Sequence, residues 1–166
     1  MDYLWSPWRY QYVSKSGPAV GCLFCLKGSE QRDKENYVVH RGPRTFVLLN
    51  IYPYSTGHLM IAPYEHVASL EPAPEATIDE MMRMARLAEI HLRRVYRPQG
   101  FNMGMNLGES AGAGVPGHIH MHVLPRWVGD TNFMTTVGET RVLPESLDVT
   151  FEKLQQAFRA DTPAAL

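Results

Sequence analysis

Residues 117–126 read Gly-His-Ile-His-Met-His-Val-Leu-Pro-Arg, and this stretch decides how the rest of the chain is interpreted. In a β-strand, side chains at positions i, i+2 and i+4 share one face and stand about 6.5–7 Å apart. A strand over residues 118–124 therefore places His118, His120 and His122 on one surface. The apolar residues between them face the opposite way, into the core.

Three neighbouring imidazoles are poorly explained by packing alone. Histidine is only intermediate in its tendency to be buried, and each ring has two nitrogens that need partners. Two chemical interpretations remain open. His-x-His pairs on strands are good zinc ligands, and one imidazole can act as a nucleophile while its neighbours fix its tautomer and charge.

The segment before the histidines favours the second interpretation. Residues 106–117 read Asn-Leu-Gly-Glu-Ser-Ala-Gly-Ala-Gly-Val-Pro-Gly, a run dominated by small residues. Their backbone N–H groups can approach and surround an anion, because few side chains stand in the way. A phosphate held by this loop would meet the histidine strand directly, so the pattern indicates phosphoryl chemistry.

Hydrophobic periodicity places the remaining elements. Apolar runs predict four further strands, and apolar residues at three- and four-residue steps predict two helices. The predicted strands cover residues 37–40, 45–51, 58–62 and 101–107, and the predicted helices cover 75–96 and 144–158. The apolar stripe of the longer helix consists of Ile78, Met81, Met82, Ala85, Ala88, Leu92 and Val95. His91, beside arginines on this helix, is expected on its solvated face.

The composition is that of an ordinary globular domain. The chain has 166 residues, of which 45% are hydrophobic and 20% charged, and its formal net charge is −1. A charge so close to zero argues against nucleic-acid or membrane partners. The chain has two cysteines and no run typical of a signal peptide or a membrane span, so we expect a cytoplasmic protein. We expect a single domain over residues 1–166 and no organic cofactor. Within it, residues 1–20 are expected to form an aromatic-rich arm, and residues 159–166 a frayed tail.

The histidine stretch resembles the His-x-His-x-His-x-x signature of the histidine-triad superfamily, and further motifs extend the resemblance over most of the chain. Residues 46–50, followed by Pro53, residues 57–63 and His66, are similar to the family's nucleotide-binding hairpin. A narrower bacterial branch includes diadenosine tetraphosphate phosphorylases. The motifs similar to that branch are residues 4–9, 50–54, 106–108, 125–127 and 129–133.

The resemblance implies an α+β fold with a five-stranded antiparallel sheet, helices on one side, and sheets joined edge to edge across a homodimer. It also implies that the middle histidine, His120, attacks the α-phosphate of a dinucleoside polyphosphate and forms a nucleotidyl-histidine. His122 and His118 complete the catalytic histidines. Asn50 matches the position that binds the ribose hydroxyls. The residues implied in phosphate binding are Asn106, Gly108, Ser110, Gly112 and Gly114.

One departure from the family pattern concerns the loop. Many members carry a glutamine and then serine or threonine just before the triad, where this chain has Gly112-Ala-Gly-Val115. Backbone amides or Ser110 must replace those side-chain donors. The acceptor of the second half-reaction is then water or inorganic phosphate. The same small-residue loop is a feature of the phosphorylase-like branch, which favours phosphate.

Two cysteines, in the pattern Cys22-Leu-Phe-Cys25, have the spacing of half a zinc site. A redox pair or two small core residues share this pattern. A tetrahedral site would have to recruit histidines, and the candidates are His40, His58, His66 and His118. Zinc-containing relatives imply a structural site made of Cys22, Cys25, His66 and His118. Such a site leaves His120 available for chemistry.

Three other functions fit the same residues. The chain could hydrolyse nucleoside phosphoramidates or adenylylated small molecules. It could instead be a regulatory protein that binds nucleotides without turnover, an alternative kept open by the missing glutamine. A zinc-binding structural protein is the third alternative, and it predicts that loss of the metal, rather than loss of His120, abolishes function.

Overall fold

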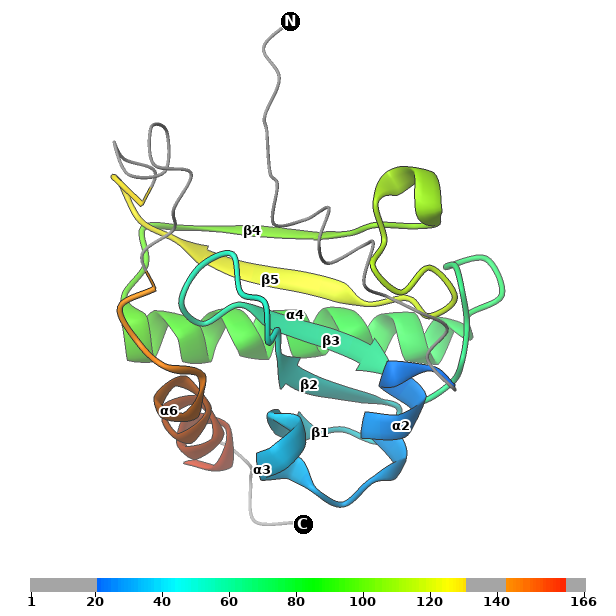
Figure 1. Cartoon of the computed structure of the whole chain (residues 1–166), viewed down its shortest axis with the longest axis horizontal. Helices are drawn as coiled ribbons and strands as arrows, with labels where there is room; N and C mark the ends of the chain where they lie inside the picture. Colours follow the sequence, from blue (N-terminus) through cyan, green and yellow to red (C-terminus); the bar gives the residue numbers. More distant parts are fainter. Residues whose placement is uncertain (1–20, 131–142, 161–166) are drawn as a thin grey trace, which may run out of the picture.

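The computed structural model describes residues 21–130 and 143–160, which fold around one antiparallel sheet (Figure 1). The strands are β1 (Val38–Arg41), β2 (Thr45–Leu49), β3 (Leu59–Pro63), β4 (Gly100–Met105) and β5 (Met121–Arg126). They lie in the order β1-β2-β3-β5-β4, and each neighbouring pair is antiparallel. The helices are α2 (Leu23–Ser29), α3 (Asp33–Asn36), α4 (Glu75–Tyr96), the 3-10 helix η1 (Glu109–Ala111) and α6 (Leu147–Ala160). The predicted α+β fold with five antiparallel strands is confirmed.

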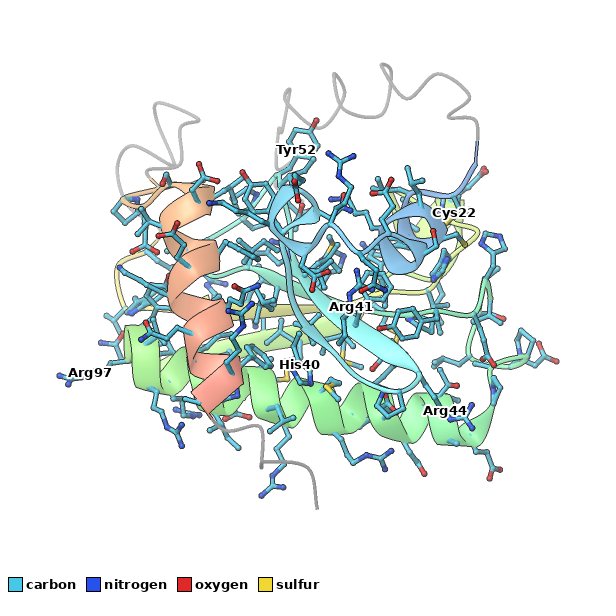
Figure 2. All side chains as sticks on the ribbon, turned by 90° about the horizontal axis from the view of Figure 1, so that it is seen from below. Cys22, His40, Arg41, Arg44, Tyr52 and Arg97 are labelled. Carbon is cyan, nitrogen blue, oxygen red and sulfur yellow. The ribbon has the colours of Figure 1, made fainter. Side chains whose placement is uncertain are left out.

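The long helices α4 and α6 cover one face of the sheet. In the view from below, α4 runs lengthwise along this face and α6 lies at a steep angle to α4 (Figure 2). The larger core lies here, and Ile119, Met121 and Val123 belong to it, as their alternation with the histidines predicts. Each such buried aliphatic side chain contributes roughly 1.5–3 kcal/mol. None of the helices within the described ranges combines the length and the apolar character that crossing a bilayer requires.

A smaller core lies on the opposite face, beneath α2. Its buried members are Phe24, Val38, Phe46, Leu48, Met60 and Ala62. Because β2 and β3 are covered on both faces, every residue in these two strands is buried. This double cover explains their continuous apolar runs. The long helices thus share one side, as expected, and the short helix α2 adds cover on the other.

Helix α4 has the predicted bounds, but two expectations about its faces are wrong. His91, expected in solvent, is 1% exposed, and its ring lies 4.2 Å from that of Phe158. Met82, assigned to the buried stripe, is 56% exposed. Steps of three and four residues put His91 in line with Met84 and Ala88, which are also buried. Helix α6 closes this side of α4, and the local sequence carries no sign of that contact.

Several boundaries also differ from the prediction, and two of them affect the histidine stretch and the predicted tail. Strand β5 begins at Met121, so His118 and His120 precede it and only His122 lies within it. The approach to the strand is nevertheless anchored, because the N–H of Ile119 donates to the carbonyl of Val67 at 2.8 Å. Helix α6 extends to residue 160, so the first two residues of the predicted tail are helical. The rest of that tail and the predicted arm over residues 1–20 lie outside the described residues.

Candidate active site and metal centre

A pocket of about 270 Å³ lies between α2, the end of β2, the histidine stretch and the loop before it. Its lining includes most of the catalytic and nucleotide-binding residues expected from the sequence. These are Asn50, Asn106, Gly112, Gly114, His120 and His122. Gly108, which precedes η1, and Ser110, which lies within it, are not among the lining residues. His118 faces a neighbouring cluster of cysteine and histidine side chains instead.

A backbone contact determines where His120 carries its proton. Nδ1 of His120 lies 2.9 Å from the carbonyl oxygen of His118. A carbonyl oxygen can only accept, so Nδ1 is the donor and Nε2 of the neutral ring is unprotonated. The ring packs against Phe24 at a centroid distance of 4.7 Å, and burial lowers the pKa of His120. A neutral imidazole with a lone pair on Nε2 is the form that a nucleophile requires.

His58 determines the tautomer of His122 in a similar way. The N–H of Tyr54 donates to Nδ1 of His58 at 3.2 Å, so the neutral His58 carries its proton on Nε2. That nitrogen lies 2.9 Å from Nδ1 of His122 and donates to it. The neutral His122 therefore keeps its own proton on Nε2, where it can serve as a donor. Burial and the neighbouring His120 lower the pKa of His122 to about 4.

Four further side chains converge where α2 begins. The potential ligand atoms of Cys22, Cys25, His66 and His118 all lie within 4.8 Å of one another. Sγ of Cys22 is 3.3 Å from Nδ1 of His118, and Sγ of Cys25 is 3.3 Å from Nδ1 of His66. Two thiols and two imidazoles are a donor set that Zn²⁺ takes in tetrahedral structural sites.

The hydrogen bonding of His118 also fits a metal ligand. Its Nε2 lies 2.9 Å from the carbonyl oxygen of Pro63 and donates to it, which leaves the lone pair of Nδ1 facing the thiols. Burial lowers the pKa of His118 and so favours the neutral, ligating form. Burial and the adjacent Cys22 raise the pKa of the Cys25 thiol. Binding of a cation would reverse that effect by displacing the thiol proton.

The other two histidines considered as ligands lie elsewhere. His40 stacks on Phe158 at 5.3 Å, and His58 bonds to His122. The sequence interpretation missed the positioning contact of His58, although the Gly57-His58 pair lies within the hairpin motif. It also missed Lys27, a residue of α2 that lines the pocket. Nothing in the sequence around Lys27 distinguishes it from a solvent-facing lysine.

The chain is similar to several known proteins. Residues 31–128 match the HIT domain family model. The AP-4-A phosphorylase of Mycobacterium tuberculosis (strain ATCC 25618 / H37Rv) is 38% identical over 154 residues, which cover 89% of this chain and 79% of the relative. The bis(5'-nucleosyl)-tetraphosphatase [asymmetrical] of Schizosaccharomyces pombe is 26% identical over 93 residues, covering 56% of this chain and 50% of the relative. A solved structure of a Zn-bound histidine triad family protein from Mycobacterium smegmatis has a TM-score of 0.68 and 25% identity, and the match covers 84% of this chain and 94% of that one.

Fold and site together define an α+β protein with buried imidazoles beside a pocket and a cysteine–histidine cluster next to them. The chain belongs to the HIT, or histidine-triad, family. Two of its relatives, the AP-4-A phosphorylase and the bis(5'-nucleosyl)-tetraphosphatase, are enzymes.

The depressed pKa of His122 predicts acid sensitivity. The unfolded chain binds a proton at this residue near the ordinary value of 6.5, whereas the folded chain binds it only near 4. The folded state is therefore destabilised as the pH falls from about 6.5 towards 4. Between pH 7 and 5 we expect the free energy of unfolding to fall by on the order of 1–2 kcal/mol more in the wild type than in His122→Gln. Urea unfolding at several pH values measures this difference.

A control is available in the same pocket. Asn106→Ala changes the lining without removing a titratable group, so its pH dependence should match that of the wild type. Equal pH dependence in the wild type and His122→Gln would contradict the assigned pKa.

Proposed function

We propose that this chain cleaves dinucleoside polyphosphates, with diadenosine tetraphosphate as the expected substrate, through a nucleotidyl intermediate on His120. One observation carries the proposal: Nδ1 of His120 donates to the carbonyl of His118 at 2.9 Å, and this leaves Nε2 as the nucleophilic nitrogen. The name of the Mycobacterium tuberculosis relative, AP-4-A phosphorylase, supports the same substrate.

The reaction proceeds in two half-reactions. In the first, Nε2 of His120 attacks the α-phosphorus; an N–P bond forms, and the bond to the bridging oxygen breaks. Diadenosine tetraphosphate thereby releases ATP, whose oxygen keeps the electron pair of the broken bond. Nε2–H of His122, oriented by His58, stabilises charge on the phosphate oxygens. In the second, inorganic phosphate or water attacks the phosphorus, breaks the N–P bond and releases ADP or AMP.

Other groups of the pocket suit a nucleotide. Asn50, at the end of β2, is the proposed partner of the ribose hydroxyls, and Asn106 with the adjoining loop is proposed to hold phosphate. The backbone N–H groups of Gly114 and Val115 make no hydrogen bond with another residue of the described ranges, and both residues line the pocket. These amides are the proposed replacements for the missing glutamine and hydroxyl donors.

Incubation with diadenosine tetraphosphate, with and without inorganic phosphate, tests this chemistry. We expect ADP and ATP, separated by chromatography, only when phosphate is present. His120→Ala should lower turnover by about 10³-fold or more, because it removes the covalent route. Met82→Ala, an exposed position on α4, is the control and should retain activity.

The other outcomes distinguish the alternatives. AMP and ATP, or two ADP, formed without phosphate would identify a hydrolase. Full activity in His120→Ala would contradict the covalent mechanism. If the wild type does not turn over this substrate, phosphoramidates are the next substrates to test. Nucleotide binding without turnover in either form would favour the regulatory alternative.

We further propose that Cys22, Cys25, His66 and His118 hold one structural Zn²⁺ ion. The bound ion would cross-link the start of α2 to the segment that leads into β5. The Zn-bound family member from Mycobacterium smegmatis supports this identity of the metal.

Metal analysis of the purified protein should find about one zinc per chain. Cys25→Ser should abolish most of this binding and lower the midpoint of thermal unfolding by on the order of 10 °C, because metal binding contributes to folding. Ser29→Ala, exposed on the same helix, is the control. A metal-free wild type whose melting is unchanged by added zinc or by a chelator would contradict the proposal.

We also propose a homodimer formed through the outer edge of β4. This strand ends the sheet, so one of its edges lacks a strand partner within the described chain. Unpaired backbone groups of an edge strand readily pair with a second strand. Its middle residues, Asn102, Met103 and Gly104, are exposed.

Sedimentation measures the assembly, and we expect about twice the chain mass of 18.8 kDa. Met103→Lys should shift the protein towards monomer, because it places a charge on the apposed edge. Met82→Lys makes the same change at an exposed site on α4 and should leave the dimer intact. A monomeric wild type at micromolar concentration would show the proposal to be wrong.

A further inference from the structure

A lysine lies in the part of the pocket wall that is otherwise apolar. Lys27 is on α2 three residues after Phe24, so the two side chains share one side of the helix. Both line the pocket, together with Leu23, Leu48 and Met60. Lys27 is only 9% exposed. A buried ammonium at this place needs an explanation, because burial of a charge is costly unless polar groups compensate.

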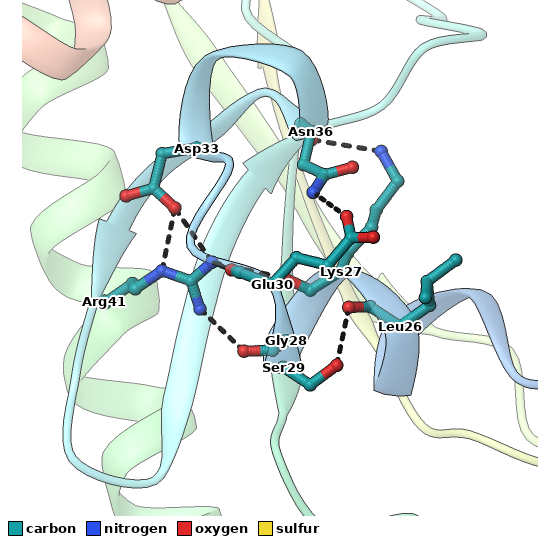
Figure 3. Close-up of polar contacts among 8 residues, drawn as sticks. All are labelled: Leu26, Lys27, Gly28, Ser29, Glu30, Asp33, Asn36 and Arg41. Atoms are coloured by element: carbon teal, nitrogen blue, oxygen red, sulfur yellow. Dashed lines mark hydrogen bonds and ion pairs between the residues drawn. The ribbon is translucent and has the colours of Figure 1, made fainter.

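Its partners within the protein are few. Nζ of Lys27 donates to the carbonyl oxygen of Asn36 at 3.0 Å (Figure 3). Among residues 21–130 and 143–160 this is its one hydrogen bond. The carboxylate of Glu30 acts on it electrostatically but does not lie within ion-pair distance. An ammonium has three N–H donors. Two of them have no hydrogen-bond partner among these residues.

The backbone that carries this lysine is held in place. Arg41 donates to three carbonyl oxygens at the end of α2, those of Lys27 (3.2 Å), Gly28 (2.8 Å) and Glu30 (2.6 Å). The guanidinium also pairs with Asp33 at 2.8 Å (Figure 3). Lys27 is therefore presented to the pocket by a fixed helix end, which is a requirement for selective recognition.

The two parts of the pocket suit different parts of a nucleotide. His120, His122 and Asn106 form a polar part that suits phosphates, whereas the apolar part suits a flat heteroaromatic base. Phe24 is the α2 side chain in ring contact with His120, and Lys27 lies almost one turn further along. Lys27 thus lies next to Phe24 in the apolar part of the wall, and not among the histidines.

Building on the proposed function, we propose that Lys27 is a specificity-determining residue whose ammonium donates a hydrogen bond to a ring nitrogen of the bound adenine. The ring nitrogens N1, N3 and N7 of adenine are acceptors, whereas its amino group mainly donates. A hydrogen bond from a charged donor distinguishes a base with an acceptor at the contacted position from one with a C–H there.

Calorimetric titration with AMP and its 1-deaza, 3-deaza and 7-deaza analogues tests this contact. One analogue should bind the wild type about tenfold more weakly than AMP does, because it lacks the accepted hydrogen bond. Lys27→Met keeps the length of the side chain and should bind that analogue and AMP equally. Lys34→Met, the same change at an exposed lysine of α3, should behave as the wild type. Ribose 5-phosphate should bind the wild type and Lys27→Met equally.

Several results would overturn the inference. One is that the wild type binds AMP and all three analogues with equal affinity. Another is that Lys27→Met still binds the affected analogue about tenfold more weakly than AMP, as the wild type does. A weakened binding of ribose 5-phosphate in Lys27→Met would assign Lys27 to the phosphate instead. Lys27→Gln replaces Lys27→Met if that variant does not fold. A wild type that binds neither AMP nor diadenosine tetraphosphate would overturn the proposed function itself, whereas normal turnover without a deaza effect overturns this inference alone.

Discussion

The hydrogen bond from Nε2 of His118 to the carbonyl of Pro63, 2.9 Å long, is the contact on which the site depends. It ties the end of β3 to the segment that leads into β5. Because it commits Nε2 as a donor, Nδ1 of His118 is left to face the thiols of Cys22 and Cys25. The backbone carbonyl of His118 accepts a hydrogen bond from Nδ1–H of His120. One residue therefore joins the cysteine–histidine cluster to the proposed nucleophile.

Backbone groups set the tautomers of His118, His120 and His58, His58 in turn sets that of His122, and burial favours the neutral form of the three triad rings. A carbonyl oxygen can only accept and an amide N–H can only donate, so each ring next to one has a defined proton position. Burial lowers the pKa of His118, His120 and His122, which keeps all three rings neutral near neutral pH. Neutral rings suit both a nucleophile and a metal ligand. The same burial is the cause of the predicted acid sensitivity, so the proposed chemistry and that prediction rest on one feature.

Helix α2 shows how much of the site depends on tertiary contacts. At 7 residues it is too short to be stable alone. Arg41 holds its C-terminal carbonyls, and Phe24 packs between the sheet and the ring of His120. In return, the helix supplies Cys25 to the cluster and Lys27 to the pocket wall. A change in the cluster is therefore expected to alter the position of the pocket wall that α2 forms.

The sequence by itself determined the features that follow from local periodicity. The three- and four-residue steps over residues 75–96 predicted α4 with its observed bounds, and the alternation around His120 predicted which neighbours enter the core. The cysteine spacing and the family resemblance indicated the cysteine–histidine cluster. Only the tertiary structure decided that His91 is buried, that His58 orients His122, and that Lys27 faces the pocket. The physical reason is the separation of the contacting residues along the chain. A local pattern shows which face of an element is apolar. The His58–His122 contact joins residues 64 positions apart, and the Cys22–His118 contact joins residues 96 positions apart.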